Sequence, residues 1–206
     1  MGTWQMIRSE RAALVDALAA LPPADWDRPS LCTGWTVRDV VAHIVATAQL
    51  TPLGFVGKFA GSGFNFGRMV GKDIAALTAA NTDDQLVALL RARIESRNAP
   101  PGPKVSWLGE TIVHGEDITR ALGGYRHHPV DHLVAVADFY KNSNTLIGSK
   151  NRIAGVTLRA TDTGWTHGNG PPASGPMTAL VLAMTGRKVA LDDLAGDGAA
   201  VLRSRP

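Results

Sequence analysis

One stretch of the sequence, WLGETIVHGEDITRALG over residues 107–123, combines acidic and imidazole side chains at helical spacing. In a helix, Glu110 and His114 lie one turn apart on the same face, and Asp117 follows nearly in line. The same face carries apolar residues, so these polar groups are expected to be partly buried. Burying them is costly unless a partner compensates them, and a metal ion bound by an imidazole and a carboxylate is such a partner. The stretch is therefore a candidate metal site.

A third ligand is predicted on another helix. Thr36 and Asp39 have the spacing of a capping box, which predicts a helix that begins at Val37 and carries His43 at the edge of its apolar stripe. Two histidines and one carboxylate with an open position are typical of catalytic zinc, because a structural site would need a fourth protein ligand. Iron(II) or nickel fits the same donors. Asp117 is expected to accept a hydrogen bond behind the ligands.

The remaining histidines and the single cysteine are weaker candidates. His127 and His128 are adjacent in a turn, and the side chains of adjacent residues rarely point at one ion, so both are expected at the surface. His132 is also expected to be exposed, and His167 is interpreted as a loop residue among glycines. Cys32 has no basic residue placed near it by the sequence to lower its pKa. We expect it to be a small buried hydrophobic residue rather than a nucleophile.

The residues around these two helices predict a helical bundle. Apolar periodicity predicts helices over 4–21, 82–97 and 130–147, and glycines at 123 and 124 are expected to end the helix of residues 107–123. Thr82 and Gln85 form a second capping box at the start of the helix over 82–97. The segment 52–72 is rich in glycine and phenylalanine, which predicts a packed irregular cap or a broken helix.

The sequence pattern changes after about residue 151. VTLRAT alternates apolar and polar residues, which predicts a half-buried strand, and the turn-rich DTGWTHGNGPP has room for a second one. A helix is predicted from Pro176 to Gly186. VALDDL and AAVLRS predict one or two further short strands. The predicted fold is therefore mainly α: a helical bundle over residues 1–150, followed by a small α/β domain over residues 151–206.

The composition narrows the function classes. The 206 residues are 45% hydrophobic and 19% charged, as in ordinary globular proteins. A net charge of +3 without a basic run argues against a nucleic-acid partner. A single cysteine excludes an intramolecular disulfide framework and suits a reducing compartment. There is no apolar leader at the start and no apolar window of membrane-spanning length, so a cytoplasmic protein without a membrane partner is expected.

Two blocks of the sequence, LCTGWTVRDVVAHI (31–44) and GETIVHGEDITRALG (109–123), resemble the N-terminal domain of the mycothiol-dependent maleylpyruvate isomerase family. That family belongs to the DinB-like metal-binding superfamily of up-down four-helix bundles. The tail, TDTGW…GPMTALVLAMTGR…GDG, is similar to the small C-terminal domain of many members, and residues 52–105 match least well. The resemblance implies a divalent metal, usually zinc, bound by His43, Glu110 and His114.

The resemblance also implies a reaction. The metal would activate the low-molecular-weight thiol mycothiol, whose thiolate attacks a small electrophile in an isomerisation or an S-transfer. A C-terminal arginine would be a suitable partner for a substrate carboxylate, and Arg187 is the first choice, with Arg159 and Arg203 as rivals. The partners implied are a small-molecule electrophile and a thiol, and both a monomer and a homodimer are compatible with the sequence.

Two other functions are compatible with the same residues. A metal-dependent hydrolase could use the open position for water, because zinc lowers the pKa of bound water to about 7. A non-enzymatic stress or regulatory binding protein could use the metal only to stabilise the bundle. Thiol-independent turnover of an ester or amide would favour the hydrolase. Metal binding with no effect of thiols on the melting temperature would favour the binding protein.

Overall fold

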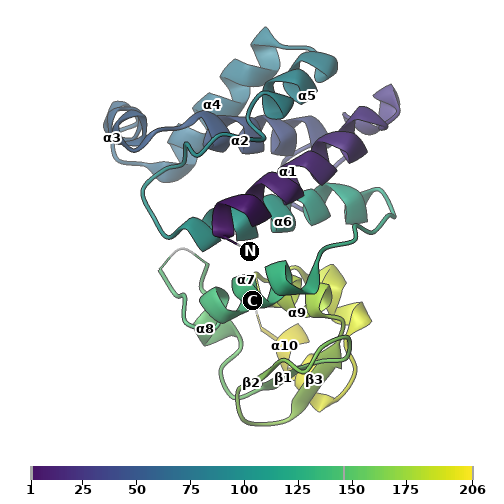
Figure 1. Ribbon diagram of the computed structural model, residues 1–206. Coiled ribbons are helices and arrows are strands. Elements are labelled where there is room, and N and C mark those ends of the chain that lie inside the picture. The colour runs from purple at the N-terminus through teal and green to yellow at the C-terminus, as the bar shows by residue number, and fades with distance from the viewer. Residues whose placement is uncertain (1, 146, 206) are drawn as a thin grey trace. The chain divides into compact units, whose positions relative to one another are not determined.

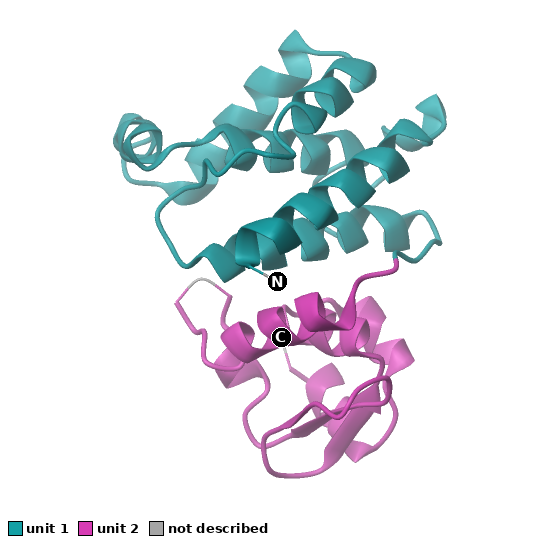
Figure 2. Cartoon of the chain, viewed as in Figure 1, with its two compact units in different colours: residues 1–126 teal, residues 127–206 magenta. Residues whose placement is uncertain are grey.

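The computed structural model describes residues 2–145 and 147–205. The fold is mainly helical, with a small three-stranded sheet in the C-terminal part, which confirms the predicted fold class (Figure 1). The chain divides into two compact units, residues 1–126 and 127–206 (Figure 2). No helix of the described residues is long and apolar enough to cross a membrane.

The N-terminal unit is a bundle whose helices contact one another along their apolar faces. α2 packs against three helices and α1 against two, so α1, α2, α5 and α6 form the bundle and α4 covers α2. Its core is built from buried aliphatic side chains such as Leu14, Val41 and Leu86. Each such side chain contributes about 1.5–3 kcal/mol when it is fully buried. The helices are α1 (Thr3–Ala19), α2 (Val37–Gln49), α3 (Pro52–Gly61), α4 (Phe66–Ala80), α5 (Asp83–Arg91) and α6 (Lys104–Ala121), with a 3₁₀ turn η1 (Pro23–Asp25).

Both predicted capping boxes are present. Thr36 Oγ1 accepts from the Asp39 backbone N at 3.2 Å, and Asp39 Oδ2 accepts from the Thr36 backbone N at 2.9 Å. Thr82 and Gln85 make the same reciprocal pair at the start of α5. α5 ends at Arg91, earlier than predicted. α6 begins at Lys104, before the predicted start, and it ends in the predicted glycine cap, where Gly123 has a φ of +80°.

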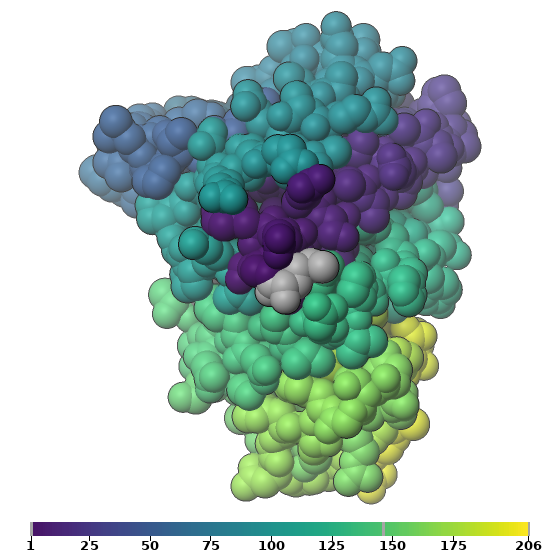
Figure 3. All heavy atoms as spheres, viewed as in Figure 1, coloured from purple at the N-terminus to yellow at the C-terminus, as the bar shows by residue number. Residues whose placement is uncertain are grey.

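The glycine- and phenylalanine-rich segment is a broken helix, one of the two predicted forms. α3 and α4 are separated by a short turn in which Gly63 and Phe64 both have positive φ, 65° and 57°. α3 fully buries none of its residues, and Leu53 is 83% exposed. In the space-filling view α3 is the blue bulge at the upper left of the N-terminal unit (Figure 3).

The C-terminal unit packs a buried helix against a small sheet. The sheet order is β2-β1-β3, with β1 antiparallel to β2 and parallel to β3. α9 packs against both α7 and β1, and nearly all of its residues are buried. The elements are α7 (Val130–Tyr140), α8 (Ser149–Arg152), β1 (Thr157–Ala160), β2 (Thr166–His167), β3 (Pro172–Gly175), α9 (Met177–Met184), η2 (Lys188–Asp193) and α10 (Asp197–Arg203).

The domain boundary and the end of α7 differ from the prediction. The chain divides into its compact units between Arg126 and His127, whereas the predicted boundary lay near residue 150, and α7 packs against α9 within the C-terminal unit. α7 also ends at Tyr140, whereas the predicted helix ran to Ile147. The residues after Tyr140 read KNSN, and asparagine and serine favour turns over helix. Leu146, inside the predicted helix, lies outside the described residues.

The strands predicted in VALDDL and AAVLRS are wrong, because these segments form the 3₁₀ helix η2 and the helix α10. In α10, Ala199 and Leu202 are both buried, and their spacing of three residues places them on one helical face. Gly198 lies so close to the backbone of Pro171 and Pro172 that a Cβ would clash. The third strand is instead β3, whose PASG sequence lacks the β-branched residues that predict strands.

Candidate metal centre

The three predicted metal ligands come together in the N-terminal unit. His43 lies on α2, whereas Glu110 and His114 lie on α6, and these two helices are in contact. His43 Nε2 is 3.6 Å from Glu110 Oε1, and the centroids of the two imidazole rings are 5.0 Å apart. The three side chains are only 14–17% exposed. The cluster is therefore mostly buried, with an edge that solvent reaches.

Asp117 orients one of the two imidazoles. Its Oδ2 lies 2.9 Å from His114 Nδ1, and its side chain is fully buried. An ionised carboxylate can only accept, so the Nδ1–H of His114 donates to it. The hydrogen bond involves Nδ1, so Nε2 is the nitrogen that His114 would present to a metal ion.

The electrostatics of the cluster fit a divalent cation. Burial, followed by the nearby His114, lowers the pKa of His43 to about 3, so His43 is a neutral imidazole at physiological pH. Burial raises the pKa of Glu110, although His114 and a hydrogen bond with Thr47 act to lower it. Two imidazoles and a buried carboxyl group are the donors that zinc and similar ions accept, and a cation would stabilise the charged form of the carboxyl group.

Cys32 is the residue that sequence reasoning missed. Cys32 is partly buried against the hydrophobic core, as a small hydrophobic residue would be, but its Sγ also lies 3.1 Å from Asp117 Oδ2 and 3.6 Å from His114 Nδ1. Among the described residues, the group whose potential ligand atoms all lie within 4.8 Å of one another is Cys32, His114 and Asp117, and it shares only His114 with the predicted ligand set. The loop that contains Cys32 is held close to α6 because the Leu31 backbone N donates to the Asp117 carbonyl O at 3.1 Å. No local sequence signal reveals this contact.

The surroundings include an aromatic wall and a groove. The Trp35 ring centroid is 5.2 Å from that of His43 and 6.4 Å from that of His114. Further along α2, Ala46 helps to line a groove of about 420 Å³ between α2, α3 and α4. One wall carries the ion pair between Lys58 Nζ and Asp73 Oδ1, 2.7 Å apart. The glycine- and phenylalanine-rich segment thus forms one side of a groove whose lining includes Ala46, three residues after His43 on α2.

The burial of two of the other histidines differs from the prediction. His127 is exposed, as predicted. His128 and His132 are 3% and 1% exposed, so their predicted surface positions are wrong. His132 lies on the buried face of α7 together with Leu133 and Val136, at helical spacing.

Arg187, the predicted carboxylate partner, directly follows α9 and Gly186 in the C-terminal unit. Its Nη1 donates to the Thr185 carbonyl O at 3.2 Å. Of its rivals, Arg203 pairs with Asp192 at 2.9 Å, whereas Arg159 is exposed on β1.

Comparisons with known proteins agree with the resemblance seen in the sequence. Residues 7–111, which include His43 and Glu110, match the family model of the mycothiol maleylpyruvate isomerase N-terminal domain. The fold is similar to the crystal structures of the mycothiol-dependent maleylpyruvate isomerase and of a mutant of it. Each is 16% identical, with a TM-score of 0.65, and the match covers 96% of this chain and 92% of the solved chain. No curated protein sequence matches significantly. The chain therefore belongs to the mycothiol maleylpyruvate isomerase N-terminal domain family, a family of enzymes.

Proposed function

We propose that the protein is a divalent-metal-dependent enzyme that uses mycothiol to isomerise a small electrophile or that joins the mycothiol sulfur atom to it in an S-transfer. The observation that supports this is the convergence of His43, Glu110 and His114 from α2 and α6 on one solvent-reaching edge of the bundle. We propose these three residues as the metal ligands and zinc as the ion, because two histidines and one carboxylate are typical of catalytic zinc.

Each residue of the cluster has a separate task in this proposal. A bound divalent ion would lower the pKa of the mycothiol thiol, so that the thiolate is present near neutral pH. His43 remains neutral because its pKa is about 3, so it offers a nitrogen lone pair throughout the physiological range. Asp117 holds the His114 ring through Nδ1, and Thr47 holds the Glu110 carboxyl group. The Trp35 ring shields one side of the imidazoles from water.

Arg187 is proposed as the partner of a substrate carboxylate. A guanidinium binds a carboxylate through two parallel hydrogen bonds. These bonds fix the orientation of the substrate, and the positive charge compensates the negative charge of the carboxylate. Because the reaction consumes or recycles a reduced thiol, we also propose that the enzyme acts in the cytoplasm.

The test measures metal content and thiol-dependent turnover together. Protein purified without added metal should contain about one equivalent of zinc, since an intact three-ligand site retains its ion. It should isomerise maleylpyruvate, or conjugate an electrophile, only when mycothiol is present. His43→Ala should lose both the metal and the turnover. His127→Ala is the matched control, because His127 is exposed and lies outside the cluster, and it should retain both.

Three outcomes would contradict the proposal. Full zinc content and activity in His43→Ala would rule out the proposed ligand set. Turnover of an ester or amide without thiol would indicate a hydrolase. Stoichiometric metal without turnover, and with a melting temperature that does not respond to thiols, would indicate a binding protein.

A further inference from the structure

The helix α3 and the turn that leads into α4 carry several large apolar side chains in solvent. Leu53 and Val56 lie on α3, Phe64 lies in the turn and Phe66 begins α4, and these four side chains are 57–83% exposed. Among the described residues only three other large hydrophobic side chains are exposed, and they lie in other parts of the chain. The space-filling view shows that α3 protrudes from the N-terminal unit (Figure 3). The exposed apolar side chains are thus concentrated on a projecting part of the molecule.

The inward face of α3 is occupied, whereas its outer face is not. Phe55 and Phe59 pack against the core of the bundle, and their rings stack with centroids 5.6 Å apart. The opposite face carries Leu53, Val56 and Ala60 at helical spacing, and all three are exposed. A surface helix normally presents polar residues to solvent. The apolar outer face of α3 therefore indicates a contact that the chain by itself does not make.

The backbone holds Phe64 in an unfavourable conformation at the turn. Phe64 is the one non-glycine residue of the described chain with a positive φ, 57°. This left-handed conformation costs free energy for most residues with a side chain, whereas glycine adopts it freely and asparagine tolerates it. The Phe64 backbone N donates to the Phe59 carbonyl O at 3.0 Å, which fixes the turn, yet the phenyl ring stays 73% exposed. Strain and exposure at the same residue point to a contact outside the chain.

The charge beside these apolar side chains is positive. Helices α3 and α4 together contain three basic residues and one acidic residue, and the acidic residue, Asp73, is paired with Lys58. Arg68 and Lys72 are exposed and make no ion pair within the described part of the chain. Lys72 Nζ donates to a main-chain carbonyl O, that of Gly61, at 3.3 Å. Because a carbonyl group does not cancel the charge of an ammonium group, both cations favour an anionic partner.

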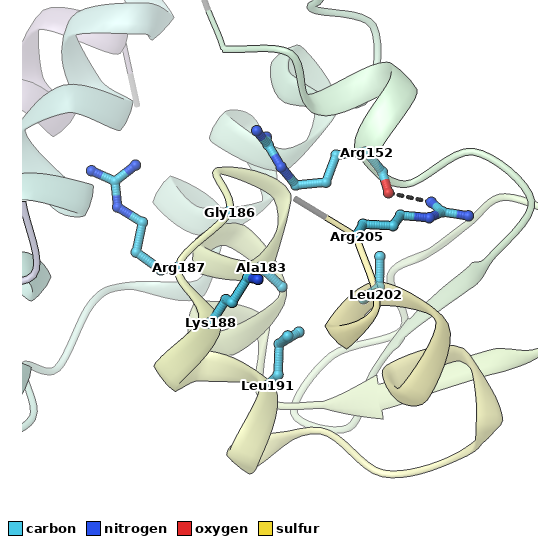
Figure 4. Close-up of a pocket in the computed structure, with 8 residues that line it drawn as sticks. All are labelled: Arg152, Ala183, Gly186, Arg187, Lys188, Leu191, Leu202 and Arg205. Atoms are coloured by element: carbon cyan, nitrogen blue, oxygen red, sulfur yellow. Dashed lines mark hydrogen bonds between the residues drawn. The ribbon is translucent and has the colours of Figure 1, made fainter. Parts of the chain in front are cut away.

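The basic residues around the small pocket of the C-terminal unit are arranged differently. The guanidinium groups of Arg152, Arg187 and Arg205 point to different sides (Figure 4). Arg152 and Arg205 also donate to main-chain carbonyl O atoms of the same unit. Lys188, at the same pocket, is exposed and lies outside α3 and α4, so it is a suitable control cation.

A lipid bilayer fits the surface on α3 and α4 better than a second copy of the chain does. A stable dimer contact uses about 20–30 residues from each partner, more than one short helix and a turn supply. In a symmetric dimer the same surface faces itself, so Arg68 and Lys72 of the two copies would approach one another, which like charges disfavour. An anionic bilayer attracts both cations, and phenylalanine and leucine side chains enter its interface.

We propose that this surface binds the interface of a bilayer that contains anionic lipids. The four apolar side chains insert below the lipid headgroups, and the two cations lie at the level of the lipid phosphates. This peripheral contact needs no membrane-spanning helix. It revises the expectation of a protein without a membrane partner, which rested on the absence of a spanning stretch. The surface contains none of the proposed metal ligands and does not depend on the proposed function. It is formed by Leu53, Val56, Phe64, Phe66, Arg68 and Lys72.

The experiment measures co-sedimentation of the complete protein with lipid vesicles. Vesicles of phosphatidylcholine alone are compared with vesicles of phosphatidylcholine and phosphatidylglycerol in equal amounts. We expect saturable binding to the anionic vesicles and much weaker binding to the neutral ones. Binding to the anionic vesicles should weaken as the salt concentration rises, because salt screens the attraction between exposed charges.

Phe64→Asn tests the apolar part of the surface, because asparagine tolerates the positive φ and so preserves the turn. It should weaken binding to the anionic vesicles about tenfold, the factor expected when one apolar side chain no longer leaves water. Tyr125→Asn is the matched control, because Tyr125 is also an aromatic residue that is 73% exposed and lies outside the surface. Its affinity should not change.

Arg68→Gln tests the charge and should weaken binding to the anionic vesicles about fivefold, whereas Lys188→Gln should bind as the wild type does. Sedimentation velocity without lipid tests the other occupant. A wild-type dimer that Phe64→Asn converts to a monomer would show that a second copy covers the surface. That result, absence of binding to the anionic vesicles, or equal affinity in Phe64→Asn and Tyr125→Asn would overturn the proposal.

Discussion

Replacing Asp117 with asparagine tests whether this carboxylate orients a metal ligand. The Asp117 side chain is fully buried, and its Oδ2 lies 2.9 Å from His114 Nδ1 and 3.1 Å from Cys32 Sγ. Asparagine keeps the size of the side chain but removes its charge. Loss of such a supporting carboxylate weakens metal binding about 10- to 100-fold, or about 1.4–2.7 kcal/mol. We expect Asp117→Asn to fall in this range.

The assay is a competition for zinc with a chromophoric chelator at pH 7, with two further variants. His43→Ala removes a proposed ligand and should weaken binding by more than about 100-fold, beyond the range of an orienting residue. Cys32→Ser should leave the affinity nearly unchanged, because in our proposal Cys32 is not a metal ligand and its thiol donates to Asp117. Cobalt-loaded protein should show no absorption from a cobalt–thiolate bond.

A different ranking of the variants would refute this reasoning. If Cys32→Ser abolished metal binding while His43→Ala preserved it, the ion would be held by Cys32, His114 and Asp117 instead. Cobalt–thiolate absorption in the wild type would support the same conclusion. An unchanged affinity in Asp117→Asn would show that the carboxylate does not orient the metal ligand.

Two further predictions concern the supporting structure. Thr36→Ala should lower the free energy of unfolding by about 1 kcal/mol, because it removes the N-cap of α2. Thr51→Ala removes the N-cap of the exposed α3 and should lower the free energy of unfolding by less. Chemical denaturation of the two variants measures the difference. The pKa of His167 is lowered by burial and by Lys141, so Lys141→Met should raise it, as an NMR titration of the imidazole would show. Because the folded state binds fewer protons at His167 than the unfolded state, its contribution to stability decreases as the pH falls, and Lys141→Met should lessen this decrease.

Local sequence signals predicted the parts of the site that depend on one helix. The spacing of Glu110 and His114 places them on one face because the helix repeats every 3.6 residues. Thr36 and Asp39 mark the start of α2 through hydrogen bonds between residues three apart, and so they also set the face on which His43 lies. The turn at Gly63 that breaks the segment 52–72 into two helices was one of the two predicted forms.

Contacts between distant segments were not accessible from the sequence. Cys32 approaches Asp117 across 85 positions, through a loop without periodicity. The burial of His128 and His132 and the packing of α7 against α9 depend on which elements meet, and apolar spacing alone does not specify that. The sequence by itself thus determined the helices and the faces on which the proposed ligands lie, because helix geometry and capping depend on near neighbours. Only the tertiary structure decided which faces meet, and hence that Cys32 shares an oxygen with His114.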